Sequence, residues 1–370
     1  MRLLILSENY PHLNNIMGDV FVHVRVKEYA KRHQVMAFSF FHQPAELVYE
    51  GVPVRLFGDM DSLVKAIGEY GPDKILIHFY QPWMLDNVIR MIGVPVVIWV
   101  HGYEALGWYR RLFNYTLYSP VFLKFVASNT VQQYHFRRLI KYANNNPDIR
   151  FVFVSNWMRK ITSQDTLCNI RKTTIIANPI DTSLFRYREK GPEMRKKVLL
   201  LRSFVTRKYA NDISVKAILE LSRREAFKEF SFTLMGQGGL FDTLTQPLRK
   251  FSNIELRKQA VRQVEIPALH EQYGVFLCPT RQDAQGVSMC EAMSSGLVPV
   301  TSRNTAIPEF VDHNVSGILT SSPREIADAL QELLEKPDKF SELSANAAKS
   351  IRDICNIVNI VDRELSIIES

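Results

Sequence analysis

The densest group of chemically capable side chains lies in residues 278–296, with the sequence CPTRQDAQGVSMCEAMSSG. An apolar run ends at the first of these residues, and a polar loop that contains Asp283 follows. We predict a helix that begins at Gly286–Ser288 and ends at Gly296, because glycine is the preferred residue just past a helix end. The first N–H groups of a helix have no partner within it and attract anions. An anion-binding site is therefore expected where this helix begins.

Glu291 lies about one turn inside the predicted helix. Side chains of a helix lean toward its N-terminus, so this carboxylate could reach a ligand bound there. A carboxylate accepts hydrogen bonds from neighbouring hydroxyl groups, which suits a ribose or another sugar beside a phosphate. The alternative is structural: Asp283 caps the helix, and Glu291 stabilises its first turn from the surface.

Other candidate residues follow predicted strands at their carboxyl ends. They are His101 and Glu104 after residues 94–100, Arg202, Arg207 and Lys208 after residues 198–201, and Gly236 in a Gly-Gln-Gly-Gly turn after residues 231–235. The three cations could bind phosphates. Taken singly, each signal is weak, because such a glycine turn is usually only a tight turn and a single histidine at a strand end is often structural.

The elements that must position these residues are short apolar runs that alternate with helical patterns. Most of the runs are continuous rather than alternating, as in parallel strands buried on both faces. The alternation predicts βαβ units and a doubly wound α/β architecture. The predicted strands are residues 3–6, 35–40, 52–57, 74–79, 94–100, 151–154 and 173–177 in the first half and 198–201, 231–235, 253–256, 275–278 and 298–301 in the second.

The segment RYREKGPEMRKK, residues 186–197, carries eight charges and a Gly-Pro pair, so it is the best candidate for a linker. We predict Rossmann-like doubly wound domains at 1–185 and 198–345 that face each other across a cleft. Ligands of such sheets bind outside the carboxyl ends of the strands. Residues 346–370 are predicted to form a C-terminal helix that packs back on the first domain.

The composition is that of an ordinary globular protein of 370 residues, with 46% apolar and 23% charged residues. It excludes a disordered chain, collagen-like repeats and a coiled coil. No run of about 18 apolar residues predicts a membrane span, and residues 1–10 are more typical of a first strand than of a signal peptide. The four scattered cysteines exclude a disulfide framework and a cysteine-rich zinc site. We expect a soluble, cytoplasmic protein.

The net charge of +8 admits anionic partners of several kinds, namely nucleic acid, an anionic membrane surface or phosphorylated small molecules. Charge alone does not choose among them.

In this order and spacing, the motifs resemble those of the retaining glycosyltransferases of family 4, which have the GT-B fold. The resemblance covers nearly the whole chain. Asp283 and Glu291 occupy the positions of the family's Glu-x7-Glu pattern. Three other segments also match: Asn178-Pro-Ile-Asp181…Phe185, Gly236-Gln-Gly238 and Ile307-Pro-Glu309…Gly317.

The resemblance implies roles for the residues of the second domain, which would bind a nucleotide-sugar. Glu291 would bind the ribose hydroxyls. Asp283 would hold the transferred sugar, together with backbone N–H groups of Gln285, Gly286 and Val287.

It also implies how phosphates and the acceptor are handled. Arg202 with Lys208 or Arg207 would neutralise the donor diphosphate as the glycosidic bond breaks. The first domain would bind the acceptor. There, His101 would lie near the anomeric carbon, and Gly18 would let backbone approach the phosphates.

The chain departs from the family pattern in four places. Asp283 is one methylene shorter than the usual Glu, and Leu201 stands where a glycine is usual. Met17-Gly18 replaces a Gly-Gly pair. One extra residue follows Arg202, so that Arg207 and Lys208 compete for one role. These changes bear on substrate recognition more than on the class of reaction.

The implied reaction is retaining transfer of a sugar from a UDP- or GDP-linked donor to a saccharide or lipid-linked saccharide in surface polysaccharide synthesis. Acceptor attack would occur on the face that the diphosphate leaves, so His101 and Glu104 can be positioning groups rather than acid and base. One alternative is an inactive GT-B subunit that stabilises a partner enzyme. An epimerase or phosphorylase of this fold fits the motifs or the length less well.

No cofactor or metal ion is expected, because two cations and a helix N-terminus can stabilise a leaving diphosphate. Asp59-Met-Asp61 spells the metal-binding motif of the other large glycosyltransferase fold. It precedes a helical pattern and is interpreted as a capping pair, with metal binding as the alternative.

Residues 108–142 interleave aromatic and basic side chains. They could lie on an anionic membrane surface, and replacing Arg110 and Arg111 would then weaken binding to anionic liposomes. The alternative is a set of core aromatics with solvated cations. No recognisable nucleic-acid-binding module accompanies the charge, so no nucleic-acid partner is expected.

Overall fold

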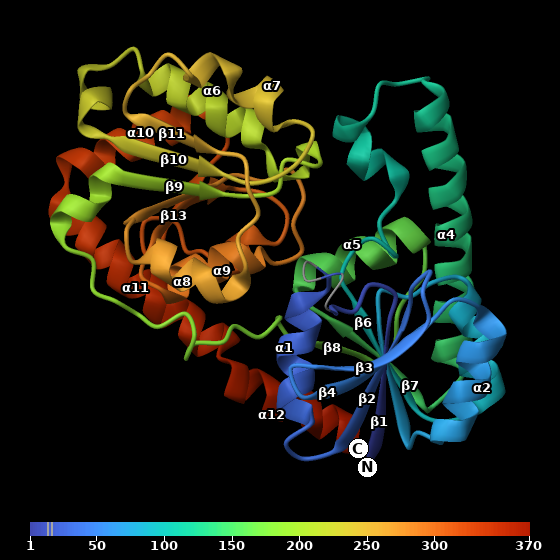
Figure 1. The fold of residues 1–370 in the computed structure, drawn as a ribbon. Coiled ribbons are helices and arrows are strands. Elements are labelled where there is room, and N and C mark those ends of the chain that lie inside the picture. The colour runs from blue at the N-terminus through green and yellow to red at the C-terminus, as the bar shows by residue number, and fades with distance from the viewer. Residues whose placement is uncertain (13–14, 16–17) are drawn as a thin grey trace. The chain divides into compact units, whose positions relative to one another are not determined.

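The computed structural model describes residues 1–12, 15 and 18–370, and it contains two compact units. The N-terminal unit comprises Met1–Pro179 together with Ile357–Ser370, and the C-terminal unit comprises Ile180–Asn356 (Figure 1). Each unit has a largely parallel sheet with helices on both faces. The predicted α/β class with two Rossmann-like doubly wound domains is confirmed. Of the predicted Met17-Gly18 pair, Met17 lies outside the described residues.

Within the described residues, the N-terminal sheet has eight strands, and the edge strand β3 alone runs antiparallel to its neighbour. Most of the strands are continuous apolar runs buried on both faces, as predicted. In sheet order they are β3 (Ala45–Tyr49), β4 (Val52–Phe57), β2 (Gln34–Phe40), β1 (Arg2–Ser7), β5 (Lys74–His78), β6 (Val96–Val100), β7 (Ile149–Phe153) and β8 (Thr173–Ile175).

Helices cover both faces of the N-terminal sheet. Helices α1 and α12 pack together on one side, whereas α2 and α4 lie on the other (Figure 1). Asp59 caps α2 by accepting a hydrogen bond from the Ser62 N–H at 2.8 Å, as the capping interpretation predicts. The α-helices of this unit are α1 (Val20–Tyr29), α2 (Met60–Tyr70), α3 (Arg90–Ile92), α4 (Pro120–Asn144), α5 (Asn156–Thr166) and α12 (Ile357–Glu369).

The C-terminal sheet has six parallel strands. In sheet order they are β11 (Ile254–Arg257), β10 (Ser231–Met235), β9 (Lys197–Leu201), β12 (Val275–Cys278), β13 (Val298–Ser302) and β14 (Ile318–Thr320). Its α-helices are α6 (Asn211–Leu221), α7 (Phe241–Thr245), α8 (Ile266–His270), α9 (Val287–Ser294), α10 (Pro323–Glu335) and α11 (Pro337–Cys355).

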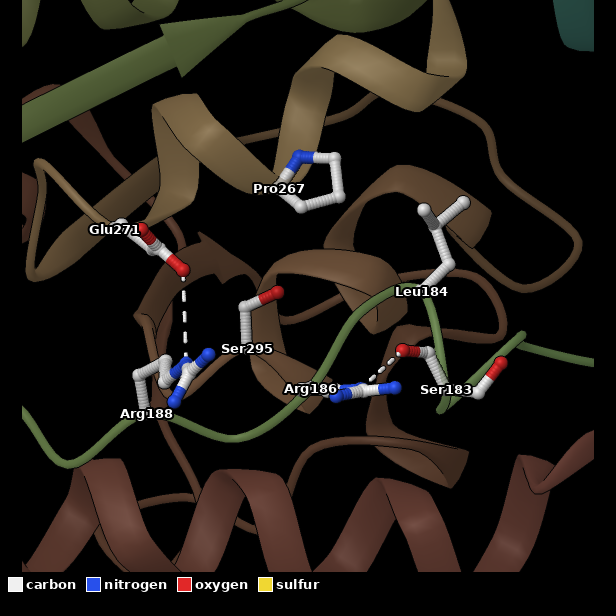
Figure 2. Close-up of a pocket in the computed structure, with 7 residues that line it drawn as sticks. All are labelled: Ser183, Leu184, Arg186, Arg188, Pro267, Glu271 and Ser295. Atoms are coloured by element: carbon white, nitrogen blue, oxygen red, sulfur yellow. Dashed lines mark hydrogen bonds and ion pairs between the residues drawn. The ribbon is translucent and has the colours of Figure 1, made fainter.

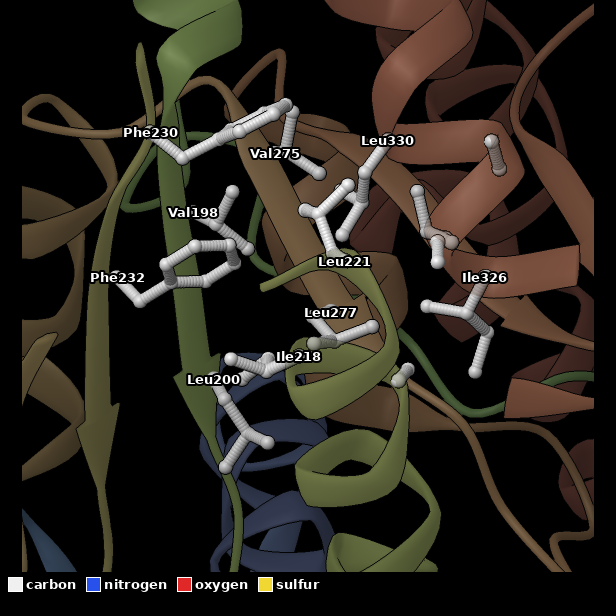
Figure 3. Packing of buried hydrophobic residues seen from close by; sticks show 14 of the residues in the cluster. Val198, Leu200, Ile218, Leu221, Phe230, Phe232, Val275, Leu277, Ile326 and Leu330 are labelled. Atoms are coloured by element: carbon white, nitrogen blue, oxygen red, sulfur yellow. The ribbon is translucent and has the colours of Figure 1, made fainter. Parts of the chain in front are cut away.

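The core of the C-terminal unit lies between this sheet and helices α6 and α10. Figure 3 shows Leu200 and Leu277 of the central strands near Ile218 of α6, and Leu330 of α10 near Leu221 of α6. Burial of one such side chain contributes about 1.5–3 kcal/mol, so this core fixes the central strands in place. The loops that follow those strands are thereby held at one edge of the sheet.

The unit boundaries differ from the predicted ones, because residues 186–197 belong to the C-terminal unit rather than forming a linker. Lys190 is buried and donates a hydrogen bond to the His270 carbonyl at 2.5 Å. Arg195 donates to the Leu334 carbonyl at 2.9 Å. Their charged ends are satisfied by backbone carbonyls while their aliphatic stems pack, so a highly charged segment can still be part of a domain.

The chain crosses between the units at residues 179–180 and again at residues 356–357. The Ile180 N–H donates to the Cys355 carbonyl at 2.8 Å, so the two crossings are tied together. The second crossing interrupts the predicted C-terminal helix, and α12 begins at Ile357 rather than at residue 346.

A buried polar network holds α12 on the N-terminal unit. Glu364 of α12 accepts hydrogen bonds from Arg25 at 2.9 Å, from Tyr29 at 2.5 Å and from the Trp99 indole at 3.2 Å. All four side chains are fully buried. Removal of Arg25 or Glu364 would leave the other charge buried and unpaired, which is strongly destabilising.

Candidate active site

Each sheet has one position where the chain reverses the direction in which it adds strands. In the C-terminal sheet this position lies between β9 and β12, and in the N-terminal sheet it lies between β1 and β5. The loops on either side of such a switch point diverge and leave a crevice at the carboxyl ends of the strands, where ligands of α/β proteins bind. The predicted site residues follow these strands or their neighbours.

Arg202 follows β9 directly and joins the two sides of the C-terminal switch point. Its guanidinium donates a hydrogen bond to the Ser288 hydroxyl at 2.7 Å, and its Nη2 lies 3.5 Å from a carboxylate oxygen of Asp283. Arg202 is buried, and its Nε has no hydrogen-bond partner among the described residues. The residue therefore offers donor capacity beyond its present contacts, at the point where a phosphate is predicted.

Asp283 organises the loop that leads into α9. Its Oδ1 accepts hydrogen bonds from the backbone N–H of Gly286 at 2.9 Å and of Gln285 at 3.4 Å, and its Oδ2 faces Arg202. The capping alternative therefore accounts for Oδ1 of Asp283 but not for Oδ2. The expectation of a free N–H at Gly286 is wrong for this state, whereas Val287 and Ser288 lie in the first turn of α9, where the helix supplies no acceptor.

Helix α9 begins and ends at glycines, as predicted. Gly286 precedes it with φ 84°, and Gly296 follows it with φ 89°. Only glycine adopts this left-handed conformation without strain. A Cβ on Gly286 would also meet Ile307 at 3.2 Å. The start of α9 is thus fixed by a residue that carries no side chain.

Glu291 is buried rather than lying on the surface, so the structural alternative for this residue is wrong. Its Oε1 accepts a hydrogen bond from the Gln263 amide at 2.9 Å. Burial raises the pKa of Glu291 to about 7, and the Gln263 hydrogen bond opposes this only in part. A buried carboxylate with an amide partner suits a ligand that donates hydroxyl hydrogen bonds.

Lys208, rather than Arg207, shares an environment with Arg202. The Arg202 guanidinium and the Lys208 ammonium both lie over the ring of Tyr209, at 4.6 Å and 5.3 Å from its centroid. The Lys208 carbonyl accepts hydrogen bonds from Thr280 and from the backbone of residue 281, which ties this loop to the one after β12. Arg207 is exposed and lies near Asp212, whose pKa its charge helps to lower.

Gly236 and Gly238 let the loop after β10 pack against the loop after β9. A Cβ on Gly236 would meet the Arg202 carbonyl at 1.9 Å, and one on Gly238 would meet the Phe204 backbone at 2.1 Å. These two glycines therefore position Arg202 by allowing close backbone contact. Direct donor binding by Gly236 stays a prediction.

In the N-terminal unit, His101 follows β6 and pairs with a second histidine. His101 Nε2 lies 3.0 Å from Nδ1 of His78, which ends β5, and the two rings are stacked. His78 is fully buried and stacks on Trp99. Burial, together with the charge of Arg25, holds the pKa of both imidazoles well below 6.5, so both are neutral at physiological pH. One ring must donate to the other, so the tautomers of the two histidines are coupled and the His101 ring is held in its orientation.

Glu104 holds the loop that carries His101. It is fully buried, and its two oxygens accept hydrogen bonds from the backbone N–H groups of His101 at 2.7 Å and Gly102 at 3.1 Å. Burial raises the pKa of Glu104, and these N–H groups oppose the shift. Both oxygens are occupied by backbone, so the geometry favours the positioning role for Glu104 over a role as acid or base.

The loop after β1 contributes Gly18 and Asp19. A Cβ on Gly18 would meet the Asn9 carbonyl at 2.5 Å, so glycine is required for packing within this loop. Asp19 is buried and accepts a hydrogen bond from the Ser7 hydroxyl at 2.7 Å. Burial raises the pKa of Asp19 to about 7, and the nearby charge of Glu104 adds to the shift.

The Asn-Pro-Ile-Asp motif lies at the crossing between the units rather than in either cluster. Asn178 accepts a hydrogen bond from Arg25 at 2.6 Å. Asp181 accepts hydrogen bonds from the N–H groups of Ser183 at 2.9 Å and Leu184 at 3.0 Å. This motif shapes the crossing and supplies no side chain to the candidate site.

A small pocket elsewhere in the C-terminal unit contains none of the predicted residues. It has a volume of about 150 Å³ and lies beyond the C-terminal end of α9 (Figure 2). Arg188 is paired there with Glu271 at 3.5 Å, and both side chains are exposed. The pocket is lined by Ser183, Leu184, Arg186, Arg188, Pro267, Glu271 and Ser295.

Sequence reasoning missed five residues that complete the two clusters, namely Ser288, Gln263, Tyr209, His78 and Asp19. His78 ends a predicted strand, as His101 does, so a signal was available for it. Nothing in the sequence connects Gln263 with Glu291 or Tyr209 with Arg202. Among the residues that the structure describes, no three histidine, cysteine, aspartate or glutamate side chains gather as metal ligands.

Residues 195–336 match the family described as "Glycosyl transferases group 1". This segment contains Arg202, Lys208, Gly236, Asp283 and Glu291. The chain is also 26% identical over 187 residues to "Amylovoran biosynthesis glycosyltransferase AmsK" of Erwinia amylovora. That alignment covers 48% of this chain and 44% of the relative, so it spans less than half of the relative's length.

Solved structures similar to the whole chain include two sugar-related proteins. The Anabaena Alr3699/HepE structure in complex with UDP and glucose has a TM-score of 0.73 at 16% identity, covering 100% of this chain and 99% of that one. Sucrose-phosphate synthase from Thermosynechococcus elongatus has a TM-score of 0.78 at 12% identity, covering 100% and 98%. The fold is thus of the predicted GT-B type, and the match to the glycosyl transferases group 1 model lies within the C-terminal unit.

Proposed function

We propose that this chain is a glycosyltransferase that moves a sugar from a UDP- or GDP-linked donor to a saccharide or lipid-linked saccharide acceptor, with retention at the anomeric carbon. One observation carries the proposal. Arg202, Ser288, Asp283 and the buried Glu291 gather at the C-terminal switch point, inside the segment that matches the group 1 family.

The C-terminal cluster would stabilise the leaving diphosphate. Arg202 would exchange its contacts with Ser288 and Asp283 for phosphate oxygens, and Lys208, which also lies over the Tyr209 ring, would add a second positive charge. The first turn of α9 would add N–H donors and the positive end of its dipole. Charge that grows on the diphosphate as the glycosidic bond breaks would thus be met by preorganised donors.

Two carboxylates would bind the donor's hydroxyl groups. Glu291 would accept hydrogen bonds from the ribose, with Gln263 holding its other side. Asp283, released by Arg202, would hold the transferred sugar together with the N–H group of Val287, and the N–H groups of Gln285 and Gly286 would join once they leave Oδ1 of Asp283. The neutral protonation state favoured by burial would give way to the carboxylate as hydroxyl donors bind.

The N-terminal cluster would serve the acceptor side of the reaction. His101, neutral and oriented by His78 and Glu104, would act near the anomeric carbon as a hydrogen-bonding group. In a same-face reaction, the acceptor hydroxyl forms the new bond to the anomeric carbon while its proton passes to the departing diphosphate oxygen. No protein base is then required.

The proposal includes a metal-independent reaction in the synthesis of a surface polysaccharide. The arginine, the lysine and the α9 N-terminus support the first part, since they supply the positive charge that a metal ion would supply. The biosynthetic role assigned to the Erwinia amylovora relative supports the second.

The test is a thermal-shift panel of UDP, GDP, ADP and CDP, each with and without Mg²⁺, on the wild type and on Glu291→Ala. A ligand present at about 100 times its Kd adds about 2.7 kcal/mol to stability. We expect one nucleotide to stabilise the wild type without Mg²⁺ and to leave Glu291→Ala unchanged. Stabilisation by no nucleotide contradicts the proposal and favours an inactive GT-B subunit that binds a partner enzyme.

A second measurement tests the stereochemistry. The product made with the identified donor is analysed by NMR for the configuration at its new anomeric centre. Inversion would contradict the retaining assignment while leaving the transferase assignment intact.

A further inference from the structure

Exposed apolar side chains are concentrated in one short part of the N-terminal unit. Of the eighteen large apolar side chains that are exposed among the described residues, nine lie between Tyr103 and Tyr134. Isolated exposed apolar residues are normal, but a contiguous group of them marks an interaction surface. No described helix is long and apolar enough to cross a membrane.

Helix α4 exposes a row of apolar side chains and buries several polar ones. Its exposed face carries Leu123, Ala127, Val131 and Tyr134, which are spaced so that they form one stripe along the helix. The opposite, buried face carries polar residues among its apolar ones. Asn129, for example, donates a hydrogen bond to the Leu106 carbonyl at 3.0 Å. A helix that faces water only would place these polar and apolar residues the other way round.

The turn that leads into α4 extends this apolar stripe. Tyr118 is 83% exposed and has φ 63°, a left-handed conformation that is uncommon for an aromatic residue. Leu117 and Val121 on either side of it are also exposed. Figure 1 shows the N-terminal half of α4 rising past the rest of its unit, with this turn at the tip.

A second layer supports the surface from behind. Tyr115 stacks on Phe125 with ring centroids 4.3 Å apart, and the Trp108 ring lies edge-on to Phe122 at 6.0 Å. These aromatics pack segment 108–115 against α4, but only Phe122 is buried and the other three are half-buried, so the core interpretation of residues 108–142 holds for Phe122 alone among them. The outward-facing side chains need a different explanation.

The charge of this region has a single sign. Residues 105–147 contain six lysine and arginine residues and no aspartate or glutamate. Arg110 is paired with Asp165 at 2.7 Å, and Arg111 lies over Tyr103, so these two are not free to bind a membrane as the sequence suggested. In contrast, Lys124 and Lys141 are exposed, and neither forms an ion pair within the described chain.

We propose that the surface formed by Leu117, Tyr118 and the α4 stripe binds an anionic lipid bilayer. The apolar side chains would enter the boundary between headgroups and acyl chains, while Lys124, Arg137 and Lys141 would contact anionic headgroups. A second copy of this chain is the weaker occupant, because a symmetric contact would bring two acid-free basic surfaces together. The proposal does not depend on transferase activity, because binding alone is measured.

The test is co-sedimentation of the full chain with vesicles of phosphatidylcholine, alone or mixed with phosphatidylglycerol. Three variants are compared with the wild type. The stripe variant, Leu123→Glu with Val131→Glu, places two negative charges in the apolar stripe of α4. Val48→Glu with Met91→Glu adds the same charge at two equally exposed positions elsewhere on the N-terminal unit. The third variant replaces Lys124, Arg137 and Lys141 by Gln. Melting temperatures confirm that each variant is folded.

We expect the wild type and the control variant to sediment with the anionic vesicles and not with phosphatidylcholine alone. Partitioning of the stripe variant onto anionic vesicles should fall at least about tenfold. In the third variant, each lysine or arginine removed should lower this partitioning about fivefold. Failure of the wild type to bind anionic vesicles at low salt would overturn the proposal, as would equal binding by the stripe variant. It would also be overturned if the wild type were a dimer in solution and the stripe variant a monomer without change in vesicle binding.

Discussion

The two side-chain clusters of this protein differ in how their charges are satisfied. In the C-terminal unit, Arg202 contacts Ser288 and Asp283, and Glu291 contacts Gln263, so these contacts are between side chains, although Oδ1 of Asp283 is held by backbone N–H groups. In the N-terminal unit, both oxygens of Glu104 are held by backbone N–H groups, and the histidines are neutral. Side-chain contacts can be exchanged for a ligand, whereas those to the backbone hold the loop itself.

This difference corresponds to the two halves of the proposed reaction. A leaving diphosphate needs positive groups whose present contacts can be exchanged for phosphate oxygens, and Arg202 of the C-terminal cluster would be such a group. An acceptor sugar needs a shaped, uncharged surface, and the paired imidazoles of His78 and His101 provide a neutral one. Both clusters also hold a buried carboxylate whose pKa is raised to about 7, Glu291 in one and Asp19 in the other. The following predictions test whether the clusters are separable in this way.

The largest effect is expected from Arg202→Gln. Loss of a preorganised cation at a developing charge should lower the transfer rate about 10³-fold. The matched control is Arg207→Gln, which removes a nearby exposed arginine and should change the rate less than about threefold by comparison. Initial rates with the identified donor provide the measurement. Equal losses in the two variants would mean that Arg207 matters as much as Arg202, so that a position over the Tyr209 ring does not mark the phosphate-binding residues.

Glu291→Gln should separate ligand binding from stability. Nucleotide affinity, measured by titration calorimetry, should fall about 100-fold, because two charge-assisted hydrogen bonds of about 1.5 kcal/mol each are lost. The folded-state pKa of about 7 lies above the unfolded value of 4.5, so this carboxyl destabilises the ligand-free protein as pH rises from 4.5 to 7.

At pH 8 the free energy of unfolding of the same variant should therefore be about 2–4 kcal/mol higher than that of the wild type. Denaturant unfolding of both proteins provides the measurement. Below pH 4.5 the difference should vanish. Glu342→Gln, an exposed change on α11, should show neither effect. A Glu291→Gln protein less stable than the wild type at pH 8 would show that this carboxylate has a stabilising partner.

Glu104→Gln should affect the N-terminal cluster alone. An amide has one acceptor oxygen, so one of the two backbone N–H groups would face an NH2 donor, at a cost of about 1–3 kcal/mol in stability. Transfer should slow while the nucleotide Kd stays at the wild-type value. Calorimetry on both proteins checks this, and a weakened Kd would mean that the clusters are coupled through the donor site.

The smallest effect concerns acid stability. His78 and His101 have folded pKa values well below 6.5, so the unfolded chain takes up protons that the folded chain does not. Stability should thus fall as pH drops below 6.5, by about 1.4 kcal/mol per pH unit for each such histidine. His78→Phe keeps the ring and should make urea unfolding less sensitive to pH between 6.5 and 5. An unchanged slope would show that His78 is protonated in the folded state.

Most of the fold could be predicted from the sequence, because parallel central strands are continuous apolar runs with helices between them. All twelve predicted strands exist, within a few residues at their ends. The two that were missed, β3 and β14, are edge strands. Strand β3 is exposed or half-buried throughout, and β14 has only three residues, so neither has the length and apolarity of a central strand.

The sequence by itself determined the local parts of the candidate site. Gly286 and Gly296 set the ends of α9, and Asp283 and Glu291 were placed at its start, because turns, caps and helix periodicity depend on neighbours in the chain. Only the tertiary structure decided the partners. The strand order brings β9 beside β12 and β5 beside β6, so that Arg202 meets Ser288 across 86 residues and His78 meets His101 across 23. Pairing at such separations is fixed by sheet topology and packing, which no local pattern encodes.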